Sequence, residues 1–236
     1  MIRGLYTSIS GLVAAMTRQS IVADNLANVN TVGFHQSNST TADFEVALAQ
    51  SSGANLGYLG TGTFATGLTL DRSQGPIEST DGPADLAIEG DGLFVVATPG
   101  GLAGTRAGNF SIDAAGTLVT ANGYPVLDTA GKPIVASGTF TVGPDGTVAG
   151  TGQKIALAGW PAGGTTRLGQ TLVDLGGTIT PAGGTIRQGS LEHSNTDVTT
   201  AMTELVSLQR QFSLSSRAIT IQDETLGDAA QLGRLK

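Results

Sequence analysis

The chain has 236 residues, a formal net charge of −7 and no cysteine, which excludes disulfide frameworks and thiolate metal sites. Proteins that bind nucleic acid neutralise phosphates with clustered basic residues, whereas the 12 Lys and Arg of this chain are scattered. Because 35 residues are glycine and glycine costs backbone entropy on folding, the chain needs many turns or some external ordering.

The first segment, residues 1–34, is predicted to be an amphipathic helix followed by a turn. Its apolar residues recur at steps of three and four, the pattern of a helix seam: Ile2, Leu5, Ile9, Leu12, Met16, Ala23 and Leu26. Its longest apolar run is shorter than the ~7–15 residues of a signal-peptide core. No apolar stretch in the chain reaches the ~18 residues of a membrane span. We therefore expect neither a cleaved signal peptide nor a membrane helix.

The predicted helix ends in the sequence NLANVNTVGFH, residues 25–35. Asn28 and Asn30 can bond local backbone groups in a turn, and Gly33 permits a positive φ that ends a helix. Phe34 then supplies an apolar anchor after the turn. The pattern predicts a helix stop with a backbone requirement at Gly33 and a packing requirement at Phe34.

The middle of the chain consists of two segments that differ in composition and in apolar pattern. Residues 35–75 are rich in Ser, Thr, Gly and Ala and are expected to form an extended arm or loop. Residues 76–190 hold short alternating apolar stretches separated by turn signals, among them Asn122-Gly123 and Asp145-Gly146. Short strands with frequent glycine predict a compact, mostly antiparallel β domain.

The last segment, residues 191–236, is predicted to be a long helix. One column of apolar residues recurs every seventh position: Val198, Leu205, Phe212, Ile219 and Leu226. Its companion column is mostly polar: Met202, Gln209, Ser216, Asp223 and Ala230. Asn195 is the expected N-cap, and Asp197 falls in the first turn, where the helix dipole favours an anion. Frequent Ser and Thr weaken both terminal helices, so each is expected to be helical only when packed against partners, one partner being the other helix.

The predicted fold class is therefore α+β, with the N- and C-terminal helices packed together as a coiled-coil-like layer and a glycine-rich β domain inserted between them. No catalytic, cofactor or metal constellation stands out. His35 and His193 lack the spacing of metal ligands and are interpreted as polar loop residues. No Gly-x-Ser-x-Gly elbow is present, so the sequence nominates no enzyme.

Three stretches of the chain resemble the flagellar basal-body rod and hook proteins. The first is the helix and turn, which match the family at Ala23, Asn25, Leu26, Ala27, Asn28, Thr31, Gly33 and Phe34, with His35 where a basic residue is common. The second is GPIESTDGPADLAIEGDGLFVV followed by TRAGNFSIDAAGTLVTANGYPVL. The third is GSLEHSNTDVTTAMTELVSLQRQFSLSSRAI, with Glu192, Ser194, Asn195, Met202 and Arg210 in place.

The resemblance implies a structural rod subunit, a drive-shaft component that polymerises through its terminal helices, with other rod subunits and copies of itself as partners. It also implies unfolded export through the flagellar type III apparatus and a location in the periplasmic section of the basal body. Asn25 and Asn28 lie three apart on one helical face, and we expect them to bond the backbone of a neighbouring subunit. Gly33 and Phe34 are expected to serve assembly and not the β domain. The expected assembly interface comprises Leu5, Ile9, Leu12, Met16, Leu26, Val198, Met202, Leu205, Phe212, Ile219 and Leu226; the family turn motif comprises Asn25, Asn28, Thr31, Gly33 and Phe34.

Three alternatives remain at this point. Within the family, the short chain and its ending favour the proximal-rod type, with a distal-rod or hook-type subunit as the alternative. A secreted glycan-binding β domain would explain the glycine-rich middle but not the helical seams. An envelope hydrolase would need an acidic pair, and the sequence nominates none.

Overall fold

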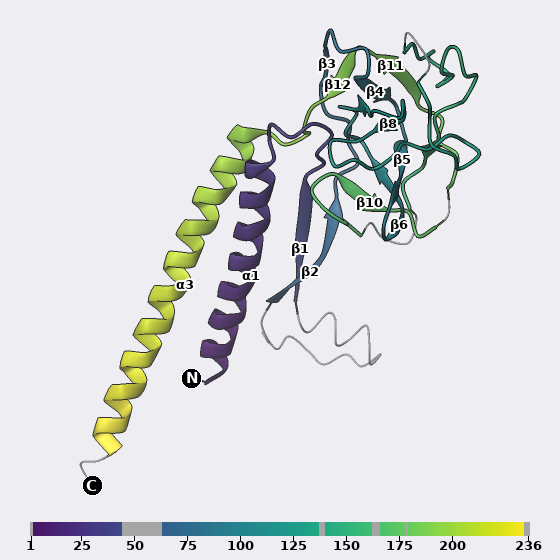
Figure 1. The fold of residues 1–236 in the computed structure, drawn as a ribbon. Helices are drawn as coiled ribbons and strands as arrows, with labels where there is room; N and C mark the ends of the chain where they lie inside the picture. The colour runs from purple at the N-terminus through teal and green to yellow at the C-terminus, as the bar shows by residue number, and fades with distance from the viewer. Residues whose placement is uncertain (1, 44–62, 137–139, 162–165, 178, 234–236) are drawn as a thin grey trace. The chain divides into compact units, whose positions relative to one another are not determined.

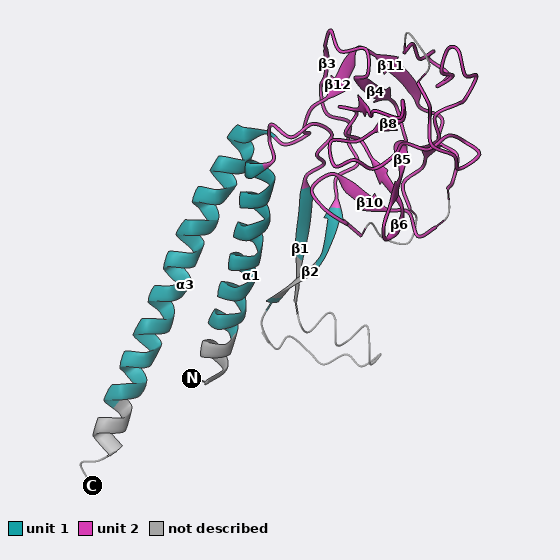
Figure 2. Ribbon diagram, viewed as in Figure 1, with its two compact units in different colours: residues 1–27, 37–69, 197–236 teal, residues 28–36, 70–196 magenta. Residues whose placement is uncertain are grey.

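The computed structural model describes residues 2–43, 63–136, 140–161, 166–177 and 179–233 (Figure 1). The chain divides into two compact units, coloured separately in Figure 2. The helical unit comprises residues 1–27, 37–69 and 197–236, and the β unit comprises residues 28–36 and 70–196. The predicted fold class is confirmed: the two terminal helices pack together, and an antiparallel β domain is inserted between them.

The helical unit is built on α1 (Ile2–Ala27) and α3 (Val198–Gly233), which lie side by side (Figure 1). Their contact is centred on Val22, Ala201 and Leu208, which are buried. Leu26 and Leu205 pack around this centre and stay partly exposed. Among the described residues, no helix is both long enough and apolar enough to cross a membrane.

The N-cap of α3 is Asp197, and not Asn195 as the sequence analysis expected. The Asp197 carboxylate accepts hydrogen bonds from the backbone N–H groups of Thr199 and Thr200, at 3.1 and 3.3 Å. The Thr200 hydroxyl donates a further bond of 2.5 Å, and these donors lower the pKa of Asp197. The Asn195 side chain is occupied elsewhere, because its Oδ1 accepts the backbone N–H of Gln36 at 2.8 Å.

The segment expected to be an arm contains two strands, β1 (Ser37–Asp43) and β2 (Thr63–Leu70), which form a two-stranded sheet; residues 44–62 of that arm lie outside the described residues. The Asn25 amide holds the start of β1 on α1. Its Nδ2 donates to the Ser37 carbonyl at 2.8 Å, and its Oδ1 accepts the Ser37 N–H at 2.9 Å. The Asn25 side chain is thus paired within its own chain, in place of the neighbouring subunit that the sequence analysis expected.

The core of the β unit is a four-stranded antiparallel sheet in the order β10 (Leu172–Asp174), β6 (Gly101–Thr105), β5 (Leu93–Thr98) and β9 (Leu157–Ala158). Alternate residues of a strand point to opposite faces of its sheet. Phe94 and Val96 enter one apolar cluster, while Leu93 and Val95 enter another. Because both faces of β5 are covered, its first four residues form a continuous apolar run with no polar alternation.

Three two-stranded antiparallel sheets complete the β unit. They pair β3 (Ile77–Ser79) with β12 (Ser190–Glu192), β4 (Leu86–Glu89) with β11 (Thr185–Gln188), and β7 (Ser111–Ile112) with β8 (Leu118–Val119). The first two sheets join the beginning of the unit to its end, with Glu192 opposite Ile77. The expected turns are present too, with φ of 80° at Gly123 and 85° at Gly146.

Candidate functional site

The turn after α1 requires glycine at position 33. Gly33 has a φ of 66°, a conformation that residues with a side chain rarely adopt. A Cβ there would lie 2.2 Å from the backbone nitrogen of Ala107. The Gly33 N–H donates to the carbonyl of Glu192 at 2.8 Å. Gly33 therefore joins the turn both to Ala107, which follows β6, and to Glu192 at the end of β12.

Phe34 is fully buried, with 0% of its surface exposed. The guanidinium of Arg167 lies over its ring at 4.5 Å from the centroid, a cation–π geometry. Its carbonyl accepts the N–H of Asn195 at 3.3 Å. All these groups belong to the β unit. The expectation that Gly33 and Phe34 stand apart from the β domain is therefore wrong, because the turn packs as part of that domain.

The other turn-motif residues hold the turn together locally. Asn28 is buried, and its carbonyl accepts the N–H of Thr31 at 3.0 Å. The Thr31 hydroxyl donates to the Asn28 side chain at 3.3 Å. These bonds are the local amide and hydroxyl contacts that the sequence predicts for a turn rich in Asn and Thr.

Glu192 is the buried anion around which the turn is organised, with 0% of its surface exposed. Its Oε2 lies 2.8 Å from Nη1 of Arg106, which is itself 2% exposed. Its Oε1 accepts the N–H of Gly75 at 3.0 Å and lies 3.4 Å from Nε2 of His35. Burial alone raises the pKa of Glu192, but His35, Arg106 and Gly75 together outweigh it and leave the pKa below its usual value.

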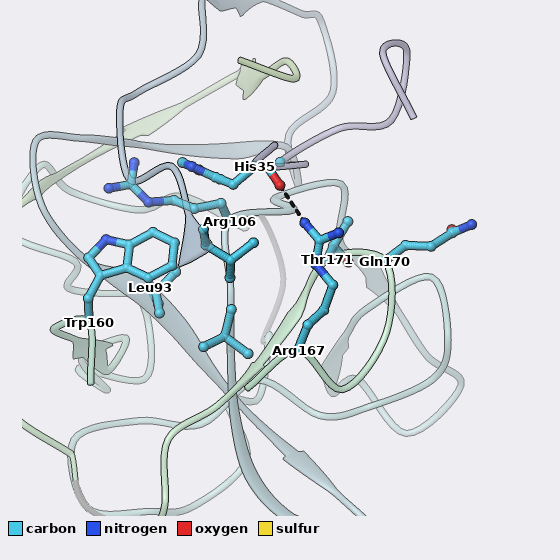
Figure 3. A pocket seen from close by; sticks show the side chains of 10 residues that line it. His35, Leu93, Arg106, Trp160, Arg167, Gln170 and Thr171 are labelled. Carbon is cyan, nitrogen blue, oxygen red and sulfur yellow. Dashed lines mark hydrogen bonds between the residues drawn. The ribbon is translucent and has the colours of Figure 1, made fainter. Parts of the chain in front are cut away.

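His35 is buried beside this carboxylate, which corrects its interpretation as a polar loop residue. Its Nδ1 lies 2.8 Å from the carbonyl of Asp71 and so donates to it. Its ring meets Trp160 edge-on at 5.2 Å, and its own carbonyl accepts a bond from Arg167 (Figure 3). The burial of His35 results from tertiary packing, which cannot be predicted from one histidine in a turn sequence. His193 stays partly exposed and pairs with Glu78 at 2.8 Å.

His35, Arg106, Trp160 and Arg167 are among the residues that line a cavity of about 10 Å³ (Figure 3). Such a volume holds about one water molecule. Within the described residues, no group of three or more His, Cys, Asp or Glu is arranged to hold a metal ion. We call the contacts of Glu192 with Arg106, Gly75, His35 and the Gly33 N–H the clasp, because they join the turn, the segment before β3 and the end of β12.

The clasp predicts that acid destabilises the β unit through Glu192. Its pKa is lower in the folded state than the ordinary value of 4.5, so the unfolded chain takes up the proton first as pH falls. The stabilisation is therefore present above about pH 4.5 and is lost as pH falls through the folded-state pKa. We expect the melting temperature to fall more steeply between pH 5 and 3 in the wild type than in Glu192→Gln. Equal slopes in the two proteins, measured by circular dichroism, would contradict this role.

The helical unit places the expected assembly residues in two groups. The exposed ones are Ile9 (42%), Met16 (53%), Val198 (38%) and Met202 (52%). The partly buried ones are Leu12, Leu26, Leu205, Phe212, Ile219 and Leu226. The side chain of Leu5 lies outside the described residues. Within the second group, Leu26 and Leu205 pack against the buried centre of the α1–α3 contact.

The companion column of α3 differs from the expected one. Ala201 and Leu208 are buried against α1, whereas Met202 and Gln209 are exposed. A column that repeats every seven residues can form a seam with the column on either side of it. The apolar Met202 favoured the column that contains Met202, whereas α1 contacts the column that contains Ala201. Ala201 presents a small side chain to α1 at this contact.

Further exposed apolar residues lie on both helices outside the predicted seam positions. Val13 of α1 is 55% exposed, and Val206, Leu214 and Ile221 of α3 are 47%, 67% and 60% exposed. The i, i+7 and i, i+8 spacing of the α3 residues places them on one face of the helix and was visible in the sequence. This second set of apolar residues was not predicted, because the more regular column from Val198 to Leu226 already accounted for a helix with one apolar face.

The structure defines a class of α+β protein in which the N- and C-terminal helices pack together. A β unit is inserted between them, and the contacts of Glu192 join the beginning of that unit to its end. Three family descriptions match the chain in this order. "Flagella basal body rod protein" matches residues 5–35, "Flagellar hook protein FlgE/F/G D1 domain" matches residues 87–150, and "Flagellar basal body rod FlgEFG protein C-terminal" matches residues 187–232.

Relatives that align along most of their length are also named flagellar basal-body rod proteins. The flagellar basal-body rod protein FlgG of Bacillus subtilis (strain 168) is 36% identical, in an alignment that covers 99% of this chain and 100% of the relative. FlgF of Rhizobium meliloti (strain 1021) is 34% identical over 89% of this chain and 88% of the relative. FlgG of Caulobacter vibrioides is 30% identical over 98% and 99%. The chain belongs to the flagellar basal-body rod protein family.

Proposed function

We propose that this member of the rod family is a structural subunit that polymerises through its terminal helices, and that it catalyses no reaction. The observation that carries the proposal is the apolar surface left on the helix pair of a single chain. Val13, Met16 and Leu214 are each more than half exposed, although their helices already pack together. Burying apolar surface in a neighbour gains about 25 cal/mol per Å².

The helices themselves support assembly as the ordering step. Ser and Thr hydroxyls of α3 bond back to carbonyls one turn earlier, as Thr203 does to Thr199 at 2.8 Å and Ser213 does to Gln209 at 3.0 Å. Such bonds weaken or bend a helix slightly, and helix formation in general depends on packing. Contacts with neighbouring subunits would supply the missing stabilisation.

The proposed partners are other flagellar rod subunits and copies of this chain, reached after export through the flagellar apparatus. The proposed location is the periplasmic section of the basal body, where the polymer would serve as the drive shaft. An acidic chain with few basic residues suits protein partners better than nucleic acid. The proximal-rod type is the proposed subtype and the distal-rod type its alternative. Relatives named FlgF and FlgG both align along most of the chain.

Leu208→Asp tests this function. The substitution places a charge in the buried contact between α1 and α3, at a cost of a few kcal/mol. We expect the variant to be absent from purified basal bodies and its cells to be non-motile, while the β unit within the purified full-length variant melts as in the wild type. Gln211→Ala, on the exposed side of α3, is the matched control and should assemble normally. Wild-type amounts of the Leu208→Asp protein in basal bodies would refute assembly through the helices.

A further inference from the structure

An open groove of about 340 Å³ lies in the β unit, to which all of its lining residues belong. Four separate segments of the chain each contribute one side-chain amide to this groove: Asn30, Asn109, Asn122 and Gln170. Its volume falls in the range of roughly 300–1,000 Å³ that is typical of small-molecule sites. We call this feature the amide groove.

Backbone pairing holds two of these amides in place. The Gly123 N–H donates to the Thr120 carbonyl at 2.8 Å and closes the tight turn that carries Asn122. Asn109 forms an antiparallel β-bridge with Asp85. A site whose backbone is fixed before binding loses less conformational freedom when a ligand arrives.

Gln170 lies on a third turn, which is closed by a bond of 2.9 Å from the Leu168 N–H to the Leu172 carbonyl. In Figure 3 the Gln170 side chain points away from His35 and Trp160. Its amide is therefore directed away from the clasp and is available to a ligand in the amide groove.

The polar groups of the amide groove are not used inside the chain. Among the described residues, the side chains of Asn30, Asn109, Asn122, Gln170 and Thr171 make no hydrogen bond. Each amide offers two N–H donors and one acceptor oxygen, and a hydroxyl acts as both donor and acceptor. The described residues that line the groove include no charged and no aromatic side chain. The groove therefore presents closely spaced neutral donors and acceptors.

These properties select a ligand by its chemistry. An ion would lose its water there without gaining an opposite charge, and an apolar molecule would leave the amides without partners. A ligand that fits is neutral and carries donors and acceptors close together. A hydroxyl group supplies both, and a saccharide has hydroxyl groups on most of its carbon atoms.

We propose that the amide groove binds a neutral saccharide. An extended peptide is also neutral and carries donors and acceptors, but it binds a sheet by pairing with a free strand edge. Strand β10, which borders the groove at Leu172, offers no such edge. Leu172 is paired with Thr105 of β6, and its carbonyl accepts the Leu168 N–H. Because no aromatic ring is present for stacking, hydrogen bonds supply the affinity, and we expect dissociation constants in the millimolar range.

Nuclear magnetic resonance of the purified full-length chain tests the proposal. The side-chain amide signals of the isotope-labelled protein are followed while maltotriose or chitotriose, both neutral saccharides, is added. We expect the signals of Asn30, Asn109, Asn122 and Gln170 to shift along saturable curves. Trigalacturonate, a saccharide of similar length that carries carboxylates, should bind about tenfold more weakly, because the groove offers its charges no partner.

The variant Asn109→Ala/Gln170→Ala removes two of the amides and should weaken saccharide binding about tenfold. Thr129→Ala, which removes an exposed hydroxyl on a different turn of the β unit, is the control and should bind as the wild type does. A thermal melt of each variant checks that the chain still folds. If the double variant does not fold, the titration of the wild type decides alone.

Three results would overturn the proposal. The first is the absence of any shift of the four amide signals with both neutral saccharides, or unchanged binding by the folded double variant. The second is equal binding of trigalacturonate, which would show that neutrality does not select the ligand. The third is a shift caused by acetyl-tetraalanine amide and not by the saccharides, which would assign the groove to a peptide segment. None of these measurements needs an assembled polymer, so their outcome is independent of the proposed function.

Discussion

Phe34→Ala should lower the melting temperature of the β unit by on the order of 10 °C. The side chain is fully buried, and truncating a buried phenylalanine costs about 3–5 kcal/mol, at a few degrees per kcal/mol for a domain of this size. The cation–π contact with Arg167 at 4.5 Å is lost as well. A thermal melt of the purified protein, followed by circular dichroism, measures the effect.

The matched control for Phe34→Ala is Leu168→Ala, an apolar residue of the same unit that is 50% exposed and should shift stability by about 0.5 kcal/mol or less. Gly33→Val tests the backbone of the same turn. Its Cβ would approach the Ala107 nitrogen to 2.2 Å at a φ of 66°, so a loss at least comparable to that of Phe34→Ala is expected. If both turn variants melt normally but fail to assemble, the turn acts in contacts between subunits and does not stabilise the β unit.

Arg106→Met should destabilise the β unit by about 3–5 kcal/mol, because removing one member of a buried ion pair leaves the other charge uncompensated. Glu192 would then be buried with its 2.8 Å partner gone, and its pKa should rise in the folded state. The carbonyls of Ile88 and Gly90 would also lose the guanidinium donors that now bond to them, at 3.3 and 2.6 Å. Chemical denaturation at pH 7 measures the loss.

The double variant Arg106→Met/Glu192→Gln separates charge from packing. Replacing both charges removes the uncompensated one, so the double variant should be more stable than Arg106→Met alone, and the coupling follows from a double-mutant cycle. His35 and Gly75 retain a side-chain oxygen to contact in Glu192→Gln. Additive losses in the cycle would mean that the two side chains do not act as a pair.

The features that depend on local pattern were predictable. The limits of both helices, the glycine of the turn and the antiparallel β insertion follow from periodicity and turn chemistry, and the structure places α1 at Ile2–Ala27 and α3 at Val198–Gly233. The cap of α3 was misplaced by two residues because Asn195 and Asp197 are both good N-cap residues, and only the fold shows that Asn195 is bonded to Gln36.

The features that depend on distant partners could not be read from the sequence. The burial of His35 and Phe34 requires Glu192 and Arg167, which lie more than 130 positions away in the chain. Likewise, the heptad column of α3 indicates that a seam exists, but the choice between Ala201 and Met202 as its companion depends on the surface of α1. Periodicity places residues on a face and does not say what covers that face.

The clasp of the β unit also sets an order of events in folding. The Gln36 N–H bonds the side chain of Asn195, 159 residues further along the chain, and the carboxylate that Arg106 and Gly75 share belongs to Glu192. Contacts of such long sequence separation form slowly, since closing the intervening loop costs entropy before the contact is gained. A chain that emerges from its amino end therefore cannot close this unit until Glu192 and Asn195 have appeared. Until about four fifths of the polypeptide is available, the turn after α1 lacks its partners Glu192 and Asn195, and the β unit stays open.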